Sequence, residues 1–207
     1  MILEGFKFSI SFLKDNFSKL LLIVSLPFIL ELIITSISLN HMTNESSGEF
    51  VSVPLILIIQ TWAQCTIIFY IHNQQTSRSI SDLYIYTLYK LPFIVLWGLF
   101  VVLVVALGLL LFIVPGIYIA LRYSFYTFEI LLSQKKGSES MKDTFAMTKS
   151  KTVQIFFYFL TPMLITILLT VMIFLFVEVM IISILYTYLL IVFFTIYTYY
   201  LYDRLKG

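Results

Sequence analysis

The sequence predicts an all-α, polytopic membrane protein with six transmembrane helices. Hydrophobic residues make up 60% of its 207 positions and charged residues only 12%. Soluble domains carry about a quarter of charged residues, so this chain has too few of them to cover a water-facing surface. The apolar residues gather in long runs, and the short connections between the runs are either basic or free of Lys and Arg. We therefore expect a single integral membrane domain of residues 1–207.

Six apolar runs fit transmembrane helices, which need about twenty residues to cross ~30 Å of hydrocarbon. The runs are apolar throughout and lack the alternation of barrel strands. This favours helices, because a helix satisfies its backbone hydrogen bonds internally. The fourth run is the shortest, and Pro115 and Gly116 before it predict a tight turn. The expected spans are Leu20–Leu39, Val53–His72, Leu91–Phe112, Ile117–Leu132, Val153–Val177 and Val179–Tyr202.

The charges of the connections predict the orientation. The connections on one side hold Glu45, Glu49 and Glu178 and neither Lys nor Arg. Cytoplasmic loops of membrane proteins are enriched in Lys and Arg, so both termini are expected in the cytoplasm. The basic residues on that side are Lys7, Lys14 and Lys19, then Arg78 and Lys90, then Lys135, Lys136, Lys142, Lys149 and Lys151, and finally Arg204 and Lys206.

Amphipathic helices are expected along the cytoplasmic interface before three of the spans. The first has apolar residues at helical spacing opposite lysines and serines, as in helices that lie on anionic headgroups. The second is expected to begin at Ser140, an N-cap residue with Asp143 three positions later. A weaker third covers Ser81 to Lys90 with Asp82. The apolar stripe of the first is Phe6, Ile10, Leu13 and Phe17, and its polar stripe is Glu4, Lys7, Ser11, Lys14 and Ser18.

A surface helix followed by two spans makes a unit, and this pattern has two interpretations. Either the chain consists of three tandem repeats, residues 1–75, 76–135 and 136–207, or basic amphipathic starts are simply common to cytoplasmic segments of multi-span proteins. The repeats would share one orientation, because each holds an even number of spans. Pro27 and Pro162 occupy matching positions in the first and fifth spans, which favours the repeats.

Polar residues inside the expected spans are the candidate binding residues: Glu31, Gln60, Gln64 and Arg122. Ionisable groups within a membrane are costly and are usually paired or functional. At about 1.5 Å per residue, Glu31 and Arg122 lie at similar depths. We therefore expect Arg122 to pair with Glu31 and a glutamine to hydrogen-bond with them. Such a layer is a structural contact, the lining of a polar cavity that binds a headgroup or small anion, or a proton relay. Glu129 is expected to reach toward Lys135 or Lys136.

Other chemistry finds no support in the sequence. It contains no Gly-rich phosphate loop, no Gly-x-Ser-x-Gly elbow and no carboxylate pair placed for acid–base work. His41 and His72 fall at opposite membrane faces and cannot share a metal, and the single Cys65 excludes an internal disulfide. We expect no enzymatic activity, no cofactor, no metal and no nucleic-acid partner.

Two segments form a more specific pattern: Gly108–Phe125, GLLLFIVPGIYIALRYSF, and Ser138–Lys151, SESMKDTFAMTKSK. This pattern resembles that of the YciC family of uncharacterised bacterial inner-membrane proteins. A similar membrane domain precedes some glycerophosphodiester phosphodiesterases. The chain departs from the family pattern at Glu129, where a proline is frequent, and at Ser133, where an acidic residue is usual. The resemblance implies a multi-pass protein of the bacterial inner membrane without an established activity. The matching positions are Pro115, Gly116, Arg122, Thr148 and Lys149.

Three functions remain open. The first is a non-enzymatic membrane protein that binds lipid or another amphiphile and supports envelope integrity, as the basic surface helices and the intramembrane polar residues indicate. The second is a small-molecule transporter or channel. The third is an accessory or immunity-like subunit that docks to another membrane protein. Membrane lipids are the expected partners in the first case, and the sequence does not determine the oligomeric state.

Overall fold

The computed structural model describes residues 1–41, 48–74, 78–133, 135–176 and 180–206. These residues are almost entirely helical and contain no strand, so the predicted all-α fold class is confirmed. The helices are α1 (Ile2–Asp15), α2 (Phe17–His41), α3 (Gly48–His72), α4 (Ile80–Leu111), α5 (Ile113–Arg122), α6 (Tyr126–Leu132), α7 (Gly137–Thr148), α8 (Thr152–Phe176) and α9 (Met180–Lys206).

Five helices in the described part of the chain are long and apolar enough to cross a membrane. They correspond to the first, second, third, fifth and sixth expected spans. Lipid-facing side chains explain why so much apolar surface stays exposed on them, since the hydrocarbon of a bilayer is as apolar as leucine. The five segments are Phe17–Ser38, Ser52–His72, Ile80–Leu111, Thr152–Val171 and Ile181–Lys206.

The fourth expected span, Ile117–Leu132, is not one continuous helix. It is divided between α5 and α6, and the helix breaks between Arg122 and Tyr126. The Ser124 hydroxyl donates a hydrogen bond to the carbonyl oxygen of Leu121 at 2.9 Å, which offers the backbone an alternative to helical pairing. Aromatic residues on both sides of this serine are also weaker helix formers than leucine. The break therefore has a local cause in the sequence.

The hairpin of the third and fourth expected spans exists, but Pro115 and Gly116 do not form its turn. The chain reverses at Phe112, which has an extended backbone with φ −159° and ψ 144°. Pro115 lies in the first turn of α5, where its missing N–H group is tolerated. Gly108 and Gly116 let the two helices approach closely, because a Cβ atom on Gly108 would lie 2.9 Å from the Cα of Gly116. Gly116 thus allows α4 and α5 to pack closely and does not form the turn.

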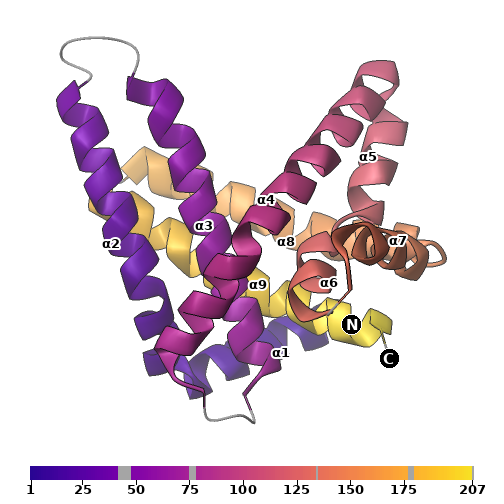
Figure 1. Ribbon diagram of the computed structural model, residues 1–207, viewed down its shortest axis with the longest axis horizontal. Coiled ribbons are helices and arrows are strands. Elements are labelled where there is room, and N and C mark those ends of the chain that lie inside the picture. The colour runs from indigo at the N-terminus through magenta and orange to yellow at the C-terminus, as the bar shows by residue number, and fades with distance from the viewer. Residues whose placement is uncertain (42–47, 75–77, 134, 177–179, 207) are drawn as a thin grey trace.

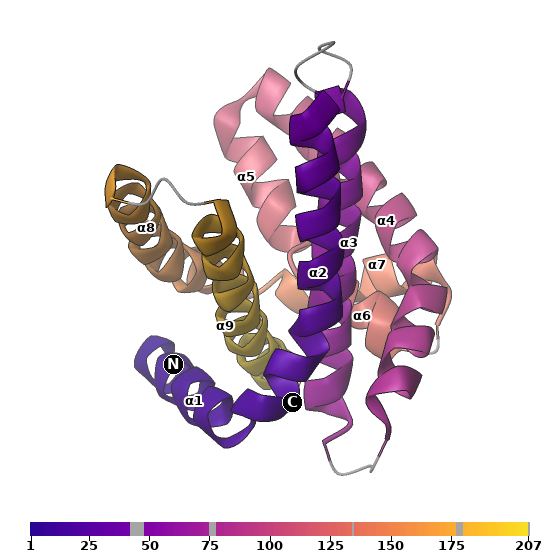
Figure 2. The ribbon, with the colours of Figure 1, turned by 90° about the vertical axis from the view of Figure 1, so that its left-hand side faces the viewer.

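Helix α3 occupies the centre of the fold and contacts α2, α4, α6 and α9. The α2–α3 and α4–α5 hairpins rise as two diverging arms in Figure 1. Figure 2 shows α8 and α9 beside the α2–α3 hairpin, with α1 below them. Inward-facing residues of α3 such as Cys65 and Ile68 are completely buried. The central helix therefore holds together elements that are distant in the sequence.

Both ends of the described chain lie in the lower half of the two views, opposite the α4–α5 turn (Figures 1 and 2). The Tyr200 hydroxyl near the C-terminus donates to the Glu4 carboxylate at 3.3 Å. The Met1 amine lies 3.3 Å from the same carboxylate, and together these neighbours lower the pKa of Glu4. The two ends are thus at the same side of the molecule.

Helix α1 forms as expected, but a different stripe of residues is buried. Gly5, Ser9 and Phe12 are the buried residues of α1, and α1 packs on α9. Gly5 allows this contact, because a Cβ atom there would lie 2.7 Å from the Tyr197 ring. Ile10, which was expected in the apolar stripe, is exposed. Phe6 and Leu13 of the expected stripe are partly buried and pack on the core, so the buried face is centred on Gly5 and Ser9 but includes two of the four expected residues.

The other two expected surface helices also differ. Helix α7 begins at Gly137, so Ser140 is not its N-cap; Ser140 is buried and its hydroxyl lies 2.9 Å from that of Ser133. The third segment has a true capping box, formed by Ser79 and Asp82. It is not a separate helix, because α4 continues from this cap to Leu111 without a break.

Candidate functional site

A buried carboxylate–amide contact lies between α2 and α3. The Gln60 side-chain amide donates to both carboxylate oxygens of Glu31, each at 3.2 Å. Glu31 is buried, and the buried Tyr188 hydroxyl of α9 lies close to its carboxylate. The expected hydrogen bond between a glutamine and Glu31 is therefore present, and it is made by Gln60.

Gln64 takes no part in this contact. It is half-buried one turn further along α3 and makes no hydrogen bond within the described residues. Of the four predicted site residues, the structure brings together only Glu31 and Gln60.

Arg122 does not pair with Glu31, so that expectation is wrong. Its side chain is completely buried, and its three guanidinium nitrogens have no hydrogen-bond partner in the described part of the chain. The guanidinium carbon lies 3.7 Å from the centre of the Phe145 ring and 5.6 Å from that of Tyr118. Aromatic faces attract cations through their quadrupole. Because α5 packs mainly on α4, α8 and α7, similar depth did not pair Arg122 with Glu31.

The backbone at Arg122 is held by α7. Helix α5 ends at this residue, so its carbonyl oxygen lacks a helical partner. The buried Thr148 hydroxyl donates to that oxygen at 3.0 Å. Irregular backbone at membrane depth is tolerated where protein surrounds it. Thr148 therefore stabilises the end of the broken helix. This hydrogen bond also joins the two segments on which the YciC resemblance rests, since Arg122 lies in Gly108–Phe125 and Thr148 in Ser138–Lys151.

Glu129 is held by the C-terminal end of α9, an arrangement that was not expected. Its buried carboxylate accepts hydrogen bonds from the Tyr202 hydroxyl at 2.9 Å and from the Lys206 amine at 2.8 Å. The expected contact with Lys135 or Lys136 is absent from the described structure, since Lys135 pairs with Asp143 instead. No signal in the sequence links Glu129 to a residue so distant along the chain.

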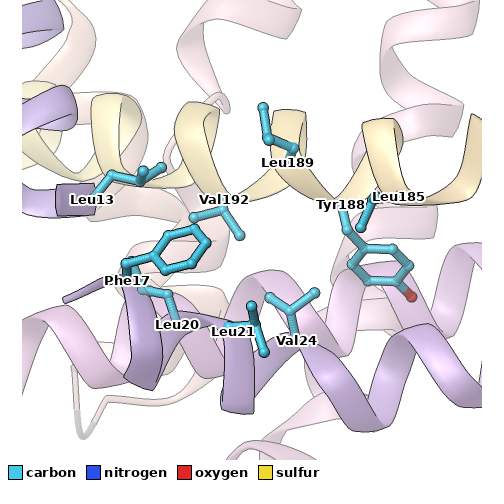
Figure 3. Close-up of a pocket in the computed structure, with 9 residues that line it drawn as sticks. All are labelled: Leu13, Phe17, Leu20, Leu21, Val24, Leu185, Tyr188, Leu189 and Val192. Carbon is cyan, nitrogen blue, oxygen red and sulfur yellow. The ribbon is translucent and has the colours of Figure 1, made fainter. Parts of the chain in front are cut away.

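An apolar groove lies between α9 and the junction of α1 and α2. Its volume is about 350 Å³, within the range of about 300–1,000 Å³ typical of small-molecule sites. Figure 3 shows side chains of α9 facing those of α1 and α2 across it. Phe17, Leu21 and Leu189 at its rim are exposed, so the groove is open at the molecular surface. It is lined by Leu13, Phe17, Leu20, Leu21, Val24, Leu185, Tyr188, Leu189 and Val192.

No polar atom is exposed in the groove, because the Tyr188 hydroxyl, the one polar group among its lining side chains, is buried. Such a surface recognises hydrocarbon by shape and dispersion and offers almost nothing to an ion or a sugar. Sequence reasoning missed the groove because its walls come from distant helices. Among the described residues, no group of three His, Cys, Asp or Glu side chains is placed to hold a metal ion.

Comparisons with family models, with curated proteins and with solved structures give no match. The resemblance to the YciC family therefore rests on the sequence motif alone.

Proposed function

We propose that this chain is a non-enzymatic integral membrane protein that binds the acyl chain of a lipid or another amphiphile in the groove between α1, α2 and α9. The observation that carries the proposal is the apolar lining of a cavity of about 350 Å³ with an exposed rim. In a bilayer, hydrocarbon fills such a hollow, and a concave apolar wall gives an acyl chain more dispersion contacts than a convex helix face does.

The place of the groove along α2 suits an acyl chain. From Phe17 to Val24 the helix rises about 10 Å, and these residues begin the apolar segment Phe17–Ser38. A chain that enters at Phe17 would therefore run from headgroup level into the hydrocarbon, past Val24 toward Tyr188. In a bilayer, this acyl chain would exchange its contacts with neighbouring lipid chains for contacts with the groove.

The same proposal includes the layout in the membrane. The positive charges of the expected cytoplasmic connections support a bacterial inner-membrane protein with both termini in the cytoplasm. Helices α5 and α6 together would complete a sixth crossing, with the break between them held at the buried residues Arg122 and Phe125. The orders α1–α2–α3 and α7–α8–α9, each with a proline inside its second helix, support tandem repeats. The role proposed for this lipid binding is to support the integrity of the cell envelope.

Lipid analysis of the purified protein tests the groove. The wild-type protein, extracted in native lipid, is expected to retain a lipid species enriched over the bulk membrane. Val24→Trp fills the groove and is expected to lower the lipid retained per protein. Leu168→Trp is the matched control, because Leu168 is exposed on α8, away from the groove. Lipid retained equally by the wild-type protein and the two variants would refute the groove as the site.

A second candidate is the transport of a small anion, because the buried Arg122 guanidinium has no anionic partner in the described structure. Anion flux into proteoliposomes measures this directly. If anion transport depends on Arg122, the wild-type protein is expected to give flux and Arg122→Gln is expected to abolish it. Gln64→Leu is the control and is expected to leave the flux unchanged.

A further inference from the structure

We propose that a second cavity, between α4 and the start of α7, binds the phosphate group of an anionic phospholipid. Its volume is about 210 Å³. Three lysines line it, Lys90 from α4 and Lys135 and Lys136 from the connection to α7, together with Tyr89, Phe93 and Gly137. The site lies on other helices than the acyl groove, so it goes beyond the proposed function and shares with it only the insertion in a membrane.

The lysines leave positive charge available in this cavity. Lys135 is paired with Asp143, and the Glu129 and Glu139 carboxylates also act on it. Lys90 and Lys136 have no ion-pair partner within the described ranges. An ammonium group binds phosphate oxygens through strong, charge-assisted hydrogen bonds. Two unpaired ammonium groups beside one paired group therefore favour an anion over a neutral ligand.

The start of α7 adds further donors. This helix has twelve residues, and its first bonded N–H groups are those of Glu139 and Ser140, which donate to the Lys136 carbonyl at 3.0 Å each. The N–H groups before them have no helical partner, and the helix dipole favours negative charge at this end. A Cβ atom at Gly137 would overlap the Trp97 indole, so glycine is needed for α7 to begin against α4.

The depth of the cavity selects a lipid over free phosphate. The apolar part of α4 runs from Leu91 to Leu111, roughly 30 Å at helical rise, which matches the hydrocarbon thickness. Lys90 therefore lies at the boundary between hydrocarbon and headgroups, where lipid phosphates are found. On the hydrocarbon side of it, Phe93 is 51% and Leu96 63% exposed, so acyl chains have an apolar surface to follow. Tyr89, 73% exposed, is an aromatic residue at interface level.

Titration of lipids into the detergent-solubilised full-length protein tests the site, with native mass spectrometry as the readout. Short-chain phosphatidylglycerol is expected to bind more tightly than phosphatidylcholine of the same chain length. Near an anionic membrane surface one lysine is worth about fivefold in binding. The double variant K90Q/K136Q is therefore expected to weaken phosphatidylglycerol binding by roughly thirtyfold. The control K142Q/K149Q removes the same charge from exposed positions of α7 and its end, and is expected to bind like wild type.

Three outcomes would overturn the proposal. They are an unchanged lipid preference in K90Q/K136Q, an equal loss in K142Q/K149Q, and displacement of the lipid by inorganic phosphate at equal concentration, which would identify free phosphate as the ligand. The experiments also distinguish a failure of the acyl-groove proposal from a failure of the phosphate-site proposal. Val24→Trp changes the total retained lipid but not the preference for phosphatidylglycerol, whereas K90Q/K136Q changes the preference alone. An unchanged thermal midpoint shows that the double variant is folded.

Discussion

The two halves of the broken helix, α5 and α6, carry one buried charge each and hold it in different ways. In α6, Glu129 accepts hydrogen bonds from Tyr202 and Lys206. In α5, Arg122 is packed against the ring of Phe145, and its nitrogens have no hydrogen-bond partner within the described residues. The comparison teaches that matching depth in a membrane does not by itself create an ion pair. The elements that happen to pack around a charge decide which groups reach it.

The paired charge of Glu129 and the unpaired charge of Arg122 are expected to contribute differently to stability. Removing one member of a buried ion pair leaves the other uncompensated, whereas an unpaired buried charge is already costly, so an apolar side chain of similar size can replace it at little or no cost. Unfolding in sodium dodecyl sulfate, followed by the fluorescence of the two tryptophans, measures this difference.

The largest effect is expected at Arg122. Arg122→Ala removes a large buried side chain and leaves a cavity, which costs about 2–5 kcal/mol. Arg122→Met keeps most of the volume and removes the unpaired charge, so its free energy of unfolding is expected to stay within about 1.5 kcal/mol of wild type or to rise. If the methionine variant is as unstable as the alanine variant, the guanidinium has a stabilising partner and the comparison fails.

The next effect is expected at Glu129. Glu129→Leu leaves the buried Tyr202 hydroxyl without its acceptor and is expected to cost about 2–3 kcal/mol. This is less than for a fully buried ion pair, because the Lys206 side chain is 52% exposed and stays partly solvated. Glu129→Gln keeps an acceptor and serves as the control, with a smaller loss expected. Equal losses in both variants would show that the charge, and not the hydrogen bond, is what stabilises.

A smaller effect is expected at Gln60. Gln60→Leu removes both hydrogen bonds to Glu31 and is expected to cost about 1 kcal/mol, since hydrogen bonds between membrane helices are worth about 0.6–1.7 kcal/mol. Gln64→Leu is the matched control on the same helix and is expected to leave stability unchanged. A loss at Gln64 that equals the loss at Gln60 would contradict the assignment of the partner.

The smallest effect is expected for the exposed pair of Lys135 and Asp143, which water and salt screen. The Asp143 carboxylate raises the pKa of Lys135 above its ordinary 10.5. The contribution of the pair is therefore complete below pH 10.5 and is lost as the pH rises through the raised value. Stability measured from pH 9 upward is expected to fall slightly more in wild type than in Asp143→Asn. Curves that run parallel would exclude this contribution.

Much of the fold could be predicted from local sequence, because lipid makes the requirements of a helix simple. Long apolar runs such as Leu91–Phe112 correspond to long helices, whereas the helix start expected at Ser81 lies at Ser79, which caps α4 together with Asp82. Gln60 and Glu31 could be associated because neighbouring helices of one hairpin pack together. The turn at Phe112 was missed because proline and glycine are also used inside helices for packing. The break after Arg122 was missed because the apolar run continues through it and masks the local effect of Ser124.

The sequence alone determined that the chain is helical and apolar enough for a membrane, and which few polar residues lie within its spans, since these properties depend on composition and periodicity. Only the tertiary structure decided that Arg122 meets Phe145, that Glu129 meets Lys206, and that α1, α2 and α9 enclose an apolar groove. The physical reason is that apolar helices attract one another with little direction. Which faces meet is decided by close packing at positions such as Gly5 and Gly116, where the absence of a side chain lets two helices approach.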